Sequence, residues 1–314
     1  MRVTLHEAAH LLKTGHVVGV ATETVYGLAA SLEHPSAIQN IYQLKGRPSN
    51  NPLIIHVADL KSVFAFMQEH VCDLDLLSRD FWPGPMTLIL PIKCKLVPSI
   101  VRANLPTAAF RIPKHPLALE LLKLTGPLVM PSANLSGRPS STLAQHVEND
   151  FGINFPILDG GACSNGLEST ILIYHQRQWQ IIRQGALDHQ QFCNCLKYTP
   201  LVYIKDKEAP PLCPGQMYRH YAPQAKLHLK GNFAHIQAGL IVGFRDRAYP
   251  AGCQILHLGS LSDPHGVAAQ LYSILRQLDS EGCKEAYIDM GFPQEGLWAT
   301  IKERLIKAAG DKNL

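Results

Sequence analysis

The sequence has few charges, no long apolar run and no dense cysteine pattern. Charged residues make up 17% of the 314 residues, and the net charge is +4. These values are too low for a disordered chain and for a strong nucleic-acid binder. The opening MRVTLHEAAHLLKTGH carries charges throughout, and no run of about 18 apolar residues occurs. We therefore expect no signal peptide, no membrane span and a cytoplasmic location.

Several catalytic and metal-binding patterns are also missing. The eight cysteines match neither the spacing of a zinc site nor a disulfide framework, so we expect reduced thiols and no protein-bound structural metal. No Walker-type loop occurs, and no Ser-His-Asp order or cluster of metal ligands stands out. An enzyme with this sequence would work by positioning its substrates and stabilising charge.

The sequence does contain enough hydrophobic residues, 46%, for a large core. Helices are expected over 36–44 and near 59–70 from the spacing of apolar residues. Strands are expected at 16–21, 53–57, 86–92, 107–113, 127–130, 156–159, 169–174 and 180–183. Many strands with helices between some of them predict an α/β domain with a mixed sheet over residues 1–205.

The composition changes near residue 205. Residues 206–225 hold four prolines and are predicted to form a linker with little regular structure. Beyond the linker, strands are expected at 225–231, 238–244, 253–258 and 286–292, and helices at 263–280 and 296–310. Gly310 is a helix stop signal. Residues 226–314 thus form a second, smaller α/β domain, and the absence of a glycine-rich loop assigns it no nucleotide site of its own.

Polar side chains recur where predicted strands end, which is where α/β folds gather ligands. ATETVYGLA (21–29) follows a strand directly, although this pattern also fits a capped turn that leads into a helix. Thr107 and Arg111 share one strand face by two-residue alternation, and an arginine between apolar neighbours needs an anionic partner. Ser169 and Arg183 lie at two further strand ends.

The loop that follows residue 44 is suited to an anion. A helix is expected to end at Gly46, where glycine allows a left-handed conformation. Arg47 then emerges beside Lys45 in a loop fixed by Pro48 and Pro52. Arginine offers forked donors and lysine a point charge, so this pair is typical of an anion clamp.

A second loop, 129–141, has the donors expected around a phosphate. Ser132, Asn134 and Ser140 supply hydroxyl and amide groups, and Gly137 allows close approach of the backbone. The same residues also fit an ordinary polar loop. Together with the cations at the strand ends, however, they favour a site for phosphates and a carboxylate.

Five motifs, TETVYGL, KGRPSNNPLIIHV, FWPGPMTLIL, PSANLSG and GLESTI, resemble in order those of the YrdC-type threonylcarbamoyl-adenylate synthases. PGQMYRHYAP resembles the linker motif of the two-domain form of that family, with Gln216 and Met217 as departures. The resemblance covers about residues 5–225. It implies a YrdC-like domain with a twisted mixed sheet and a concave site, followed by a small Rossmann-like α/β domain.

The resemblance also implies an activity. In that family, L-threonine takes up CO2 derived from bicarbonate on its amine, and the carbamate attacks the α-phosphate of ATP. Pyrophosphate leaves, with Mg2+ on the phosphates. Partner proteins then transfer the threonylcarbamoyl group to the tRNA adenosine beside the anticodon.

Position by position, the resemblance assigns roles to residues of four groups. The catalytic group is Lys45, Arg47, Ser132 and Asn134. The ATP-binding group is Arg47, Asn51, Thr107, Ser132, Ser140 and Arg183. The threonine-binding group is Thr24, His56, Arg111 and Ser169. The linker, expected to act as a lid over the site, contributes Tyr218, His220 and Tyr221.

Two other functions use a similar domain. One is an RNA-binding module without catalysis, but the near-neutral charge and the lack of interleaved basic and aromatic residues leave weak RNA binding at most. The other is a carbamoyl-transfer enzyme of hydrogenase maturation. Such proteins carry zinc-finger regions, and the cysteine pairs of a zinc finger are missing from this sequence.

Overall fold

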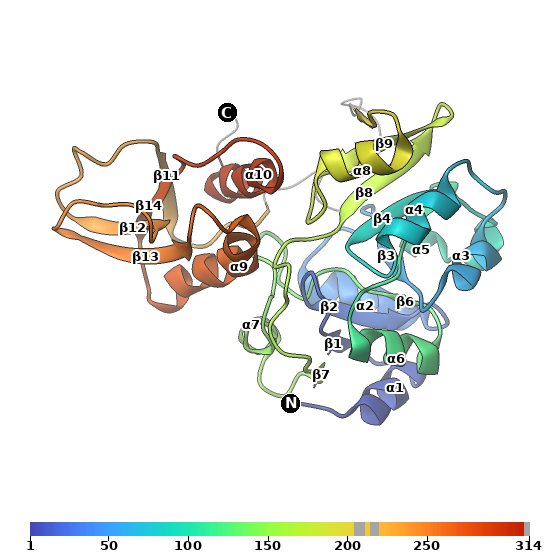
Figure 1. Cartoon of the computed structure of the whole chain (residues 1–314). Helices are drawn as coiled ribbons and strands as arrows, with labels where there is room; N and C mark the ends of the chain where they lie inside the picture. The colour runs from blue at the N-terminus through green and yellow to red at the C-terminus, as the bar shows by residue number, and fades with distance from the viewer. Residues whose placement is uncertain (204–210, 214–219, 311–314) are drawn as a thin grey trace.

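The computed structural model describes residues 1–203, 211–213 and 220–310. Within these ranges the chain forms two α/β parts. The larger part includes the N-terminus, and the strands of the smaller part begin at Lys226 (Figure 1). The α/β class predicted from the sequence is confirmed for both parts.

Strands of the larger part form one mixed sheet. In chain order they are β1 (Val18–Val20), β2 (Gly27–Ser31), β3 (Ile54–His56), β4 (Met86–Pro91), β5 (Thr107–Arg111), β6 (Leu128–Val129), β7 (Ile157–Leu158), β8 (Thr170–His175), β9 (Gln178–Arg183) and β10 (Leu201–Val202). Their spatial order is β10-β9-β8-β4-β5-β3-β6-β2-β1-β7. β3 and β5 are parallel, as are β4 and β8, whereas β4 and β5 are antiparallel. The predicted mixed sheet is therefore confirmed.

Helices connect these strands and pack on the sheet. They are α1 (Leu5–Lys13), α2 (Pro35–Lys45), α3 (Leu60–Phe66), α4 (Leu74–Phe81), the short 3-10 turn η1 (Cys94–Leu96), α5 (Ser99–Arg102), α6 (Pro116–Thr125), α7 (Ala144–Phe151) and α8 (His189–Leu196). α2 buries Ala37, Ile38 and Ile41, which lie on one helical face. It ends at Gly46 with φ 60°, as the stop signal predicts.

The TETVYGL motif leads into a strand. Residues 22–26 form a turn, and β2 follows at Gly27, so the alternative of a helix after this turn is wrong. Every residue of β2 is buried. The strand pairs antiparallel with β1 on one side and with β6 on the other, and these two sets of backbone hydrogen bonds favour the extended conformation.

The smaller part has an all-parallel sheet. Its strands are β11 (Lys226–Lys230), β12 (Gly239–Phe244), β13 (Cys253–Gly259) and β14 (Glu285–Asp289), in the spatial order β11-β14-β12-β13. Two helices, α9 (Pro264–Ser280) and α10 (Leu297–Ala309), lie between this sheet and the larger part (Figure 1). α10 ends at Gly310 with φ 74°, which confirms the predicted stop.

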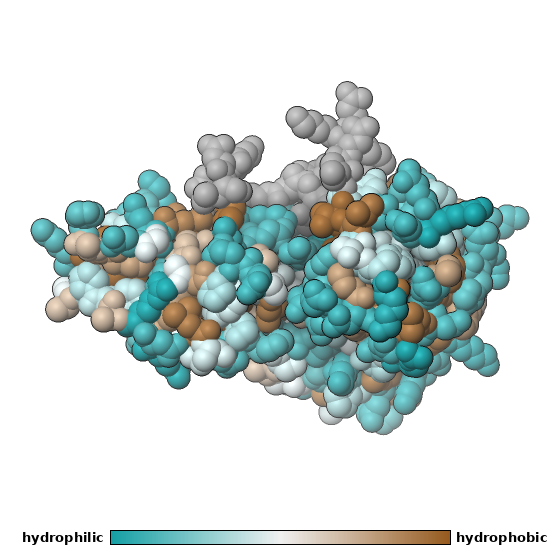
Figure 2. Space-filling model, turned by 45° about the horizontal axis from the view of Figure 1, so that its top comes forward, coloured by the Kyte–Doolittle hydropathy of each residue, from teal (hydrophilic) through white to brown (hydrophobic). Residues whose placement is uncertain are grey.

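The hydrophobic core of the smaller part extends across the boundary. Val25 and Leu167 of the larger part and Tyr221, which lies in the predicted linker, belong to the same buried cluster as the apolar residues of α9 and α10. The outer face in Figure 2 is mostly hydrophilic, with hydrophobic residues in small groups. The eight cysteines, all among the described residues, form no disulfide. Among those residues, no helix combines the length and apolar character that a membrane crossing requires.

Candidate functional site

Three motif loops are tied together by backbone hydrogen bonds. The amide of Tyr26 donates to the carbonyl of Ser141 over 2.8 Å, and the amide of Ala133 donates to the carbonyl of Tyr26 over 2.7 Å. The amide of Ser136 donates to the carbonyl of Lys45 over 2.8 Å. The turn 22–26, the C-terminal end of α2 and the loop 129–141 therefore meet, although they are far apart in the sequence.

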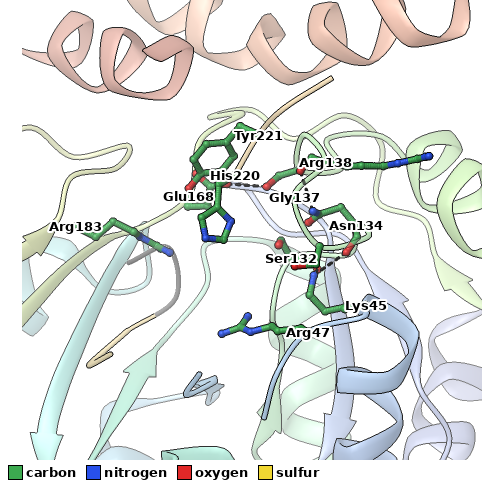
Figure 3. Close-up of a pocket in the computed structure, with 12 residues that line it drawn as sticks. Lys45, Arg47, Ser132, Asn134, Gly137, Arg138, Glu168, Arg183, His220 and Tyr221 are labelled. Carbon is green, nitrogen blue, oxygen red and sulfur yellow. Dashed lines mark hydrogen bonds between the residues drawn. The ribbon is translucent and has the colours of Figure 1, made fainter. Parts of the chain in front are cut away.

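A cavity of about 50 Å³ lies where these loops meet. It is lined by Lys45, Arg47, Ser132, Asn134, Ser136, Gly137, Arg138, Ser140, Glu168, Arg183, His220 and Tyr221. Figure 3 shows Arg183 on one side, Lys45 and Arg47 on the other, and the His220 ring pointing into the space between them. All four predicted catalytic residues line this pocket, together with Ser140 and Arg183 of the predicted ATP group.

Lys45 presents a buried ammonium to the pocket. Its Nζ donates to the backbone carbonyl of Ser132 and, over 2.8 Å, to that of Asn134. Burial lowers the pKa of Lys45 well below its ordinary value, and the nearby cation Arg47 lowers it further. An anion in the pocket would favour the charged form again.

Arg47 is held by the loop that follows it. Its Nη2 donates to the carbonyls of Asn51 and Pro52 over 3.2 and 3.0 Å. Burial lowers the pKa of Arg47 to about 10, and Arg183 contributes to the lowering. Two guanidinium groups close enough for one to lower the pKa of the other form a site suited to a polyanion.

Three buried polar atoms at this pocket have no hydrogen-bond partner among the described residues. They are Nε of Arg47, Oδ1 of Asn134 and Nε2 of His220. Burial lowers the pKa of His220 to about 4, so the ring is neutral at neutral pH. Buried polar groups are normally paired, and a donor, an acceptor and an imidazole left unpaired at one cavity are suited to a polar ligand.

Two residues of the predicted threonine group lie on neighbouring strands, His56 in β3 and Arg111 in β5, whereas Thr24 lies in the turn before β2 and Ser169 directly precedes β8. Thr24, His56, Arg111 and Ser169 are all buried. His56 and Arg111 are direct partners in the β3–β5 register, and burial together with the charge of Arg111 lowers the pKa of His56 well below its ordinary value. Nη2 of Arg111 lies 2.7 Å from Oε1 of Glu23. A cation and an anion are thus adjacent inside the protein.

Ser169 connects the two groups. Nη2 of Arg183, which lines the pocket, lies 3.2 Å from Oγ of Ser169, and Oγ of Thr87 lies 2.7 Å from the same atom. Thr24 is held by a 2.9 Å contact between its hydroxyl and that of Thr22. The residues predicted to bind ATP and those predicted to bind threonine are therefore in contact through Arg183 and Ser169.

Only some of the remaining predicted residues line the pocket. Asn51 is buried beside Arg47, and its Oδ1 has no partner among the described residues. Thr107 is the first residue of β5 and is partly buried, and it does not line the pocket described above. His220 and Tyr221 do line the pocket, whereas Tyr218 lies outside the described residues, as do Gln216 and Met217.

Sequence reasoning did not assign roles to Glu23, Arg138 or Glu168. Arg138 and Glu168 line the pocket, and Glu23 pairs with Arg111. Glu168 lies two residues before the buried strand β8, which begins at Thr170, and it is itself buried. A carboxylate beside a buried strand needs a cation or several donors, and that signal was present in the motif GLESTI.

Comparisons with known proteins agree along the whole chain. Residues 10–185 match the family model Sua5_yciO_yrdC, described as "Telomere recombination". Residues 188–310 match the model described as "Threonylcarbamoyl-AMP synthase, C-terminal domain". The protein named threonylcarbamoyl-AMP synthase from Bacillus subtilis (strain 168) is 38% identical, over 98% of this chain and 93% of its own length. The protein of the same name from Pyrococcus abyssi is 34% identical, over 96% and 93%.

Solved structures agree in fold. The crystal structure of P. abyssi Sua5 complexed with L-threonine matches with a TM-score of 0.87 and 32% identity, over 99% of this chain and 96% of that one. A full-length HypF structure is similar in fold alone, with a TM-score of 0.51 and 18% identity over 58% of this chain and 29% of that one. The match to both family models and the coverage of the relatives show that this chain belongs to the Sua5-type threonylcarbamoyl-AMP synthases, in their two-domain form.

Proposed function

We propose that this chain synthesises L-threonylcarbamoyl-AMP and pyrophosphate from L-threonine, bicarbonate or CO2, and ATP. The observation that carries the proposal is the pocket in which Lys45, Arg47 and Arg183 converge around unpaired buried polar atoms. Such a pocket is suited to the phosphates of ATP. The L-threonine in the related P. abyssi structure supports the amino-acid substrate.

The cations of the pocket account for the handling of ATP. Lys45 and Arg47 would bind the phosphates and stabilise the negative charge that builds up as the α-phosphate is attacked. Ser132, Asn134 and Ser140 would fix the nucleotide by hydrogen bonds. Asn51, Thr107 and Arg183 complete the proposed ATP-binding group.

The ion pair of Arg111 and Glu23 is suited to binding the amino-acid substrate. Threonine is a zwitterion, so Arg111 would bind its carboxylate while Glu23 faces its ammonium. Loss of the ammonium proton gives an amine, whose nitrogen bonds to CO2 and releases a second proton to the solvent to form the carbamate. A carbamate oxygen then attacks the α-phosphate, and pyrophosphate leaves. Thr24, His56 and Ser169 would line the threonine side, where the buried neutral His56 adds no second positive charge.

Mg2+ would enter with ATP. No group of three His, Cys, Asp or Glu residues suited to a metal occurs in the part of the chain that the structure describes. Glu168, the one carboxylate among the described lining residues, is already hydrogen-bonded to Ser140. The phosphates and water would therefore hold the ion, which would neutralise phosphate charge.

The product would be consumed by cytoplasmic proteins that transfer the threonylcarbamoyl group to the tRNA adenosine beside the anticodon. The mixed anhydride of a carbamate and AMP is an activated acyl donor, which fits such a transfer. Weak RNA binding by this chain is compatible with that role.

Pyrophosphate release tests the proposal. We expect release only when ATP, L-threonine and bicarbonate are all present, and none of note when any one is omitted. Arg47→Ala should lower kcat/KM for ATP by about 100-fold or more, the effect of removing one charge-stabilising donor. The exposed Arg177→Ala is the matched control. Release that does not depend on threonine would refute the proposed reaction.

A further inference from the structure

Glu168 links the nucleotide pocket to the smaller part of the molecule. Its Oε1 accepts a 2.7 Å hydrogen bond from Oγ of Ser140, which lines the pocket. Its Oε2 accepts from the hydroxyl of Tyr272 over 2.9 Å and from Nε of Arg304 over 3.2 Å. Tyr272 belongs to α9 and Arg304 to α10. One carboxylate is therefore shared between an ATP-pocket hydroxyl and two side chains of the C-terminal part.

The same two side chains enclose Tyr221. The rings of Tyr221 and Tyr272 stack with centroids 5.2 Å apart and an angle of 19°. Cζ of Arg304 lies 5.0 Å from the centroid of the Tyr221 ring, in a cation–π arrangement. Both Tyr221 and Tyr272 are buried, and Arg304 is completely buried. Figure 3 shows Tyr221 and Glu168 together at the side of the pocket that faces these helices.

The backbone conformation of Tyr221 indicates that its surroundings hold this residue in place. Its φ is 64°, a left-handed conformation that is unfavourable for a residue with a side chain. Such a conformation persists only where the surroundings fix it. Here the ring is held on two sides, and the amide of Ala222 donates to the carbonyl of Gly137 over 2.8 Å. Because His220 directly precedes Tyr221, this fixed backbone sets the direction of the His220 ring.

The charges around Glu168 keep its carboxylate ionised despite burial. Burial alone would raise the pKa of Glu168, but the charges of Arg304 and Arg183 and the hydrogen bond from Ser140 outweigh it and lower the pKa. Glu168 thus stays ionised and keeps its role as acceptor. Nη2 of Arg304 also donates to the carbonyl of Gln184 over 2.7 Å, which fixes the guanidinium against the strand end that carries Arg183.

We propose that Tyr272 and Arg304 are positioning residues for the nucleotide pocket, acting through Glu168 on Ser140 and through Tyr221 on His220. The inference rests on the proposed function, because it takes ATP as the ligand of this pocket. It assigns to the C-terminal part an indirect influence on nucleotide binding, exerted by two side chains that do not line the pocket themselves.

Binding of a non-reactive ATP analogue, in which a methylene group replaces the oxygen that bridges the α- and β-phosphates, tests the inference without turnover. Tyr272→Phe keeps the ring and its stack on Tyr221 but removes the hydroxyl that Glu168 accepts. Arg304→Lys keeps the charge but removes the planar guanidinium, whose Nε donates to Glu168 and whose Nη2 donates to the carbonyl of Gln184. We expect each variant to weaken analogue binding about tenfold or more, while the affinity for L-threonine changes less than about twofold. Arg304→Gln should lose more than Arg304→Lys.

Tyr287→Phe, a tyrosine of β14 in the same part, is the control and should bind the analogue like the wild type. Unchanged analogue binding by Tyr272→Phe and Arg304→Lys would overturn the inference. So would an equal loss of analogue and threonine affinity together with a lower Tm, since that pattern indicates general loss of structure. If Arg304→Lys does not fold, the conservative Tyr272→Phe alone decides. Failure of the proposed reaction is recognised separately, as analogue binding without threonine-dependent pyrophosphate release.

Discussion

Nη2 of Arg111 lies 2.7 Å from Oε1 of Glu23, and both side chains are almost completely buried. Their distance identifies an ion pair, whereas Oε1, Oε2 and Nη2 make no hydrogen bond of good geometry to the described residues. A buried pair with unused hydrogen-bonding capacity is suited to exchange its internal contact for the two charges of a zwitterion.

Glu23→Gln tests this relationship. The substitution keeps the size of the side chain but removes the anion that would face the threonine ammonium. We expect KM for L-threonine to rise about tenfold or more, as for loss of a charged hydrogen bond, with KM for ATP nearly unchanged. Glu33→Gln, at an exposed position, is the control. A larger effect on ATP than on threonine would contradict the assignment of Glu23 to the amino-acid side.

We predict that Lys45 takes up a proton when the nucleotide binds. Its pKa is lowered by burial and by Arg47, so the side chain of the free protein gives up its proton at a lower pH than an exposed lysine does. Phosphates raise that pKa again, and the binding of an ATP analogue should therefore take up protons. Calorimetry in two buffers of different ionisation enthalpy measures this uptake directly. It should vanish in Lys45→Met, and an equal uptake in the variant would assign the proton to another group.

We predict that His146 and His220 make the stability of the folded protein sensitive to acid. Burial, with Arg276 contributing, lowers the pKa of His146 to about 4, and burial lowers that of His220 to about 4. The unfolded chain binds these protons near the ordinary histidine value of about 6.5. Between about pH 6.5 and pH 4 the unfolded state holds more protons, so the free energy of unfolding falls as pH falls.

Urea unfolding at pH 7 and pH 5 measures this effect. His146 should contribute a loss of about 2 kcal/mol at pH 5. His146→Gln should reduce the pH dependence by that amount, whereas the exposed His10→Gln should not. Identical pH dependence in the two variants would show that His146 is not the group responsible.

Gly166 reports how closely the two parts pack. An added Cβ would lie 2.4 Å from the carbonyl oxygen of Ala268 and 2.4 Å from Cα of Ala269, both in α9. Gly161 has a similar left-handed backbone, φ 83° against 67°, but nothing lies within 4 Å of its Cβ position. Alanine at either site carries backbone strain of ~1–2 kcal/mol.

Gly166→Ala should therefore destabilise the protein by ~1–3 kcal/mol more than Gly161→Ala, because only the former also forces α9 outward. Thermal unfolding of the two variants measures the difference. Equal losses in Tm would mean that α9 gives way without cost.

Much of the pocket was predictable because its residues lie in motif loops at strand ends. Lys45, Arg47, Ser132 and Asn134 meet because the backbone of α2 and of the loop after β6 brings them together. The stop at Gly46 was readable from glycine's tolerance of a left-handed conformation. These features depend on local sequence and on the general geometry of an α/β sheet.

The partners of Glu168 were not predictable. Ser140, Tyr272 and Arg304 lie 28, 104 and 136 residues away from it in the chain. No periodicity relates such distant positions, and only the packing of α9 and α10 against the larger part brings them to one carboxylate. The pairing of Glu23 with Arg111 is hidden in the same way, because it depends on the order of strands in the sheet.

The buried cluster that contains Val25, Leu167 and Tyr221 together with the apolar faces of α9 and α10 makes the two parts thermodynamically dependent. Separation of the two parts would expose these apolar side chains to solvent, which is unfavourable. Heating should consequently melt the molecule in one cooperative transition, with calorimetric and van't Hoff enthalpies equal. A chain cut after residue 225 would lose the apolar partners of Val25 and Leu167 and become prone to self-association.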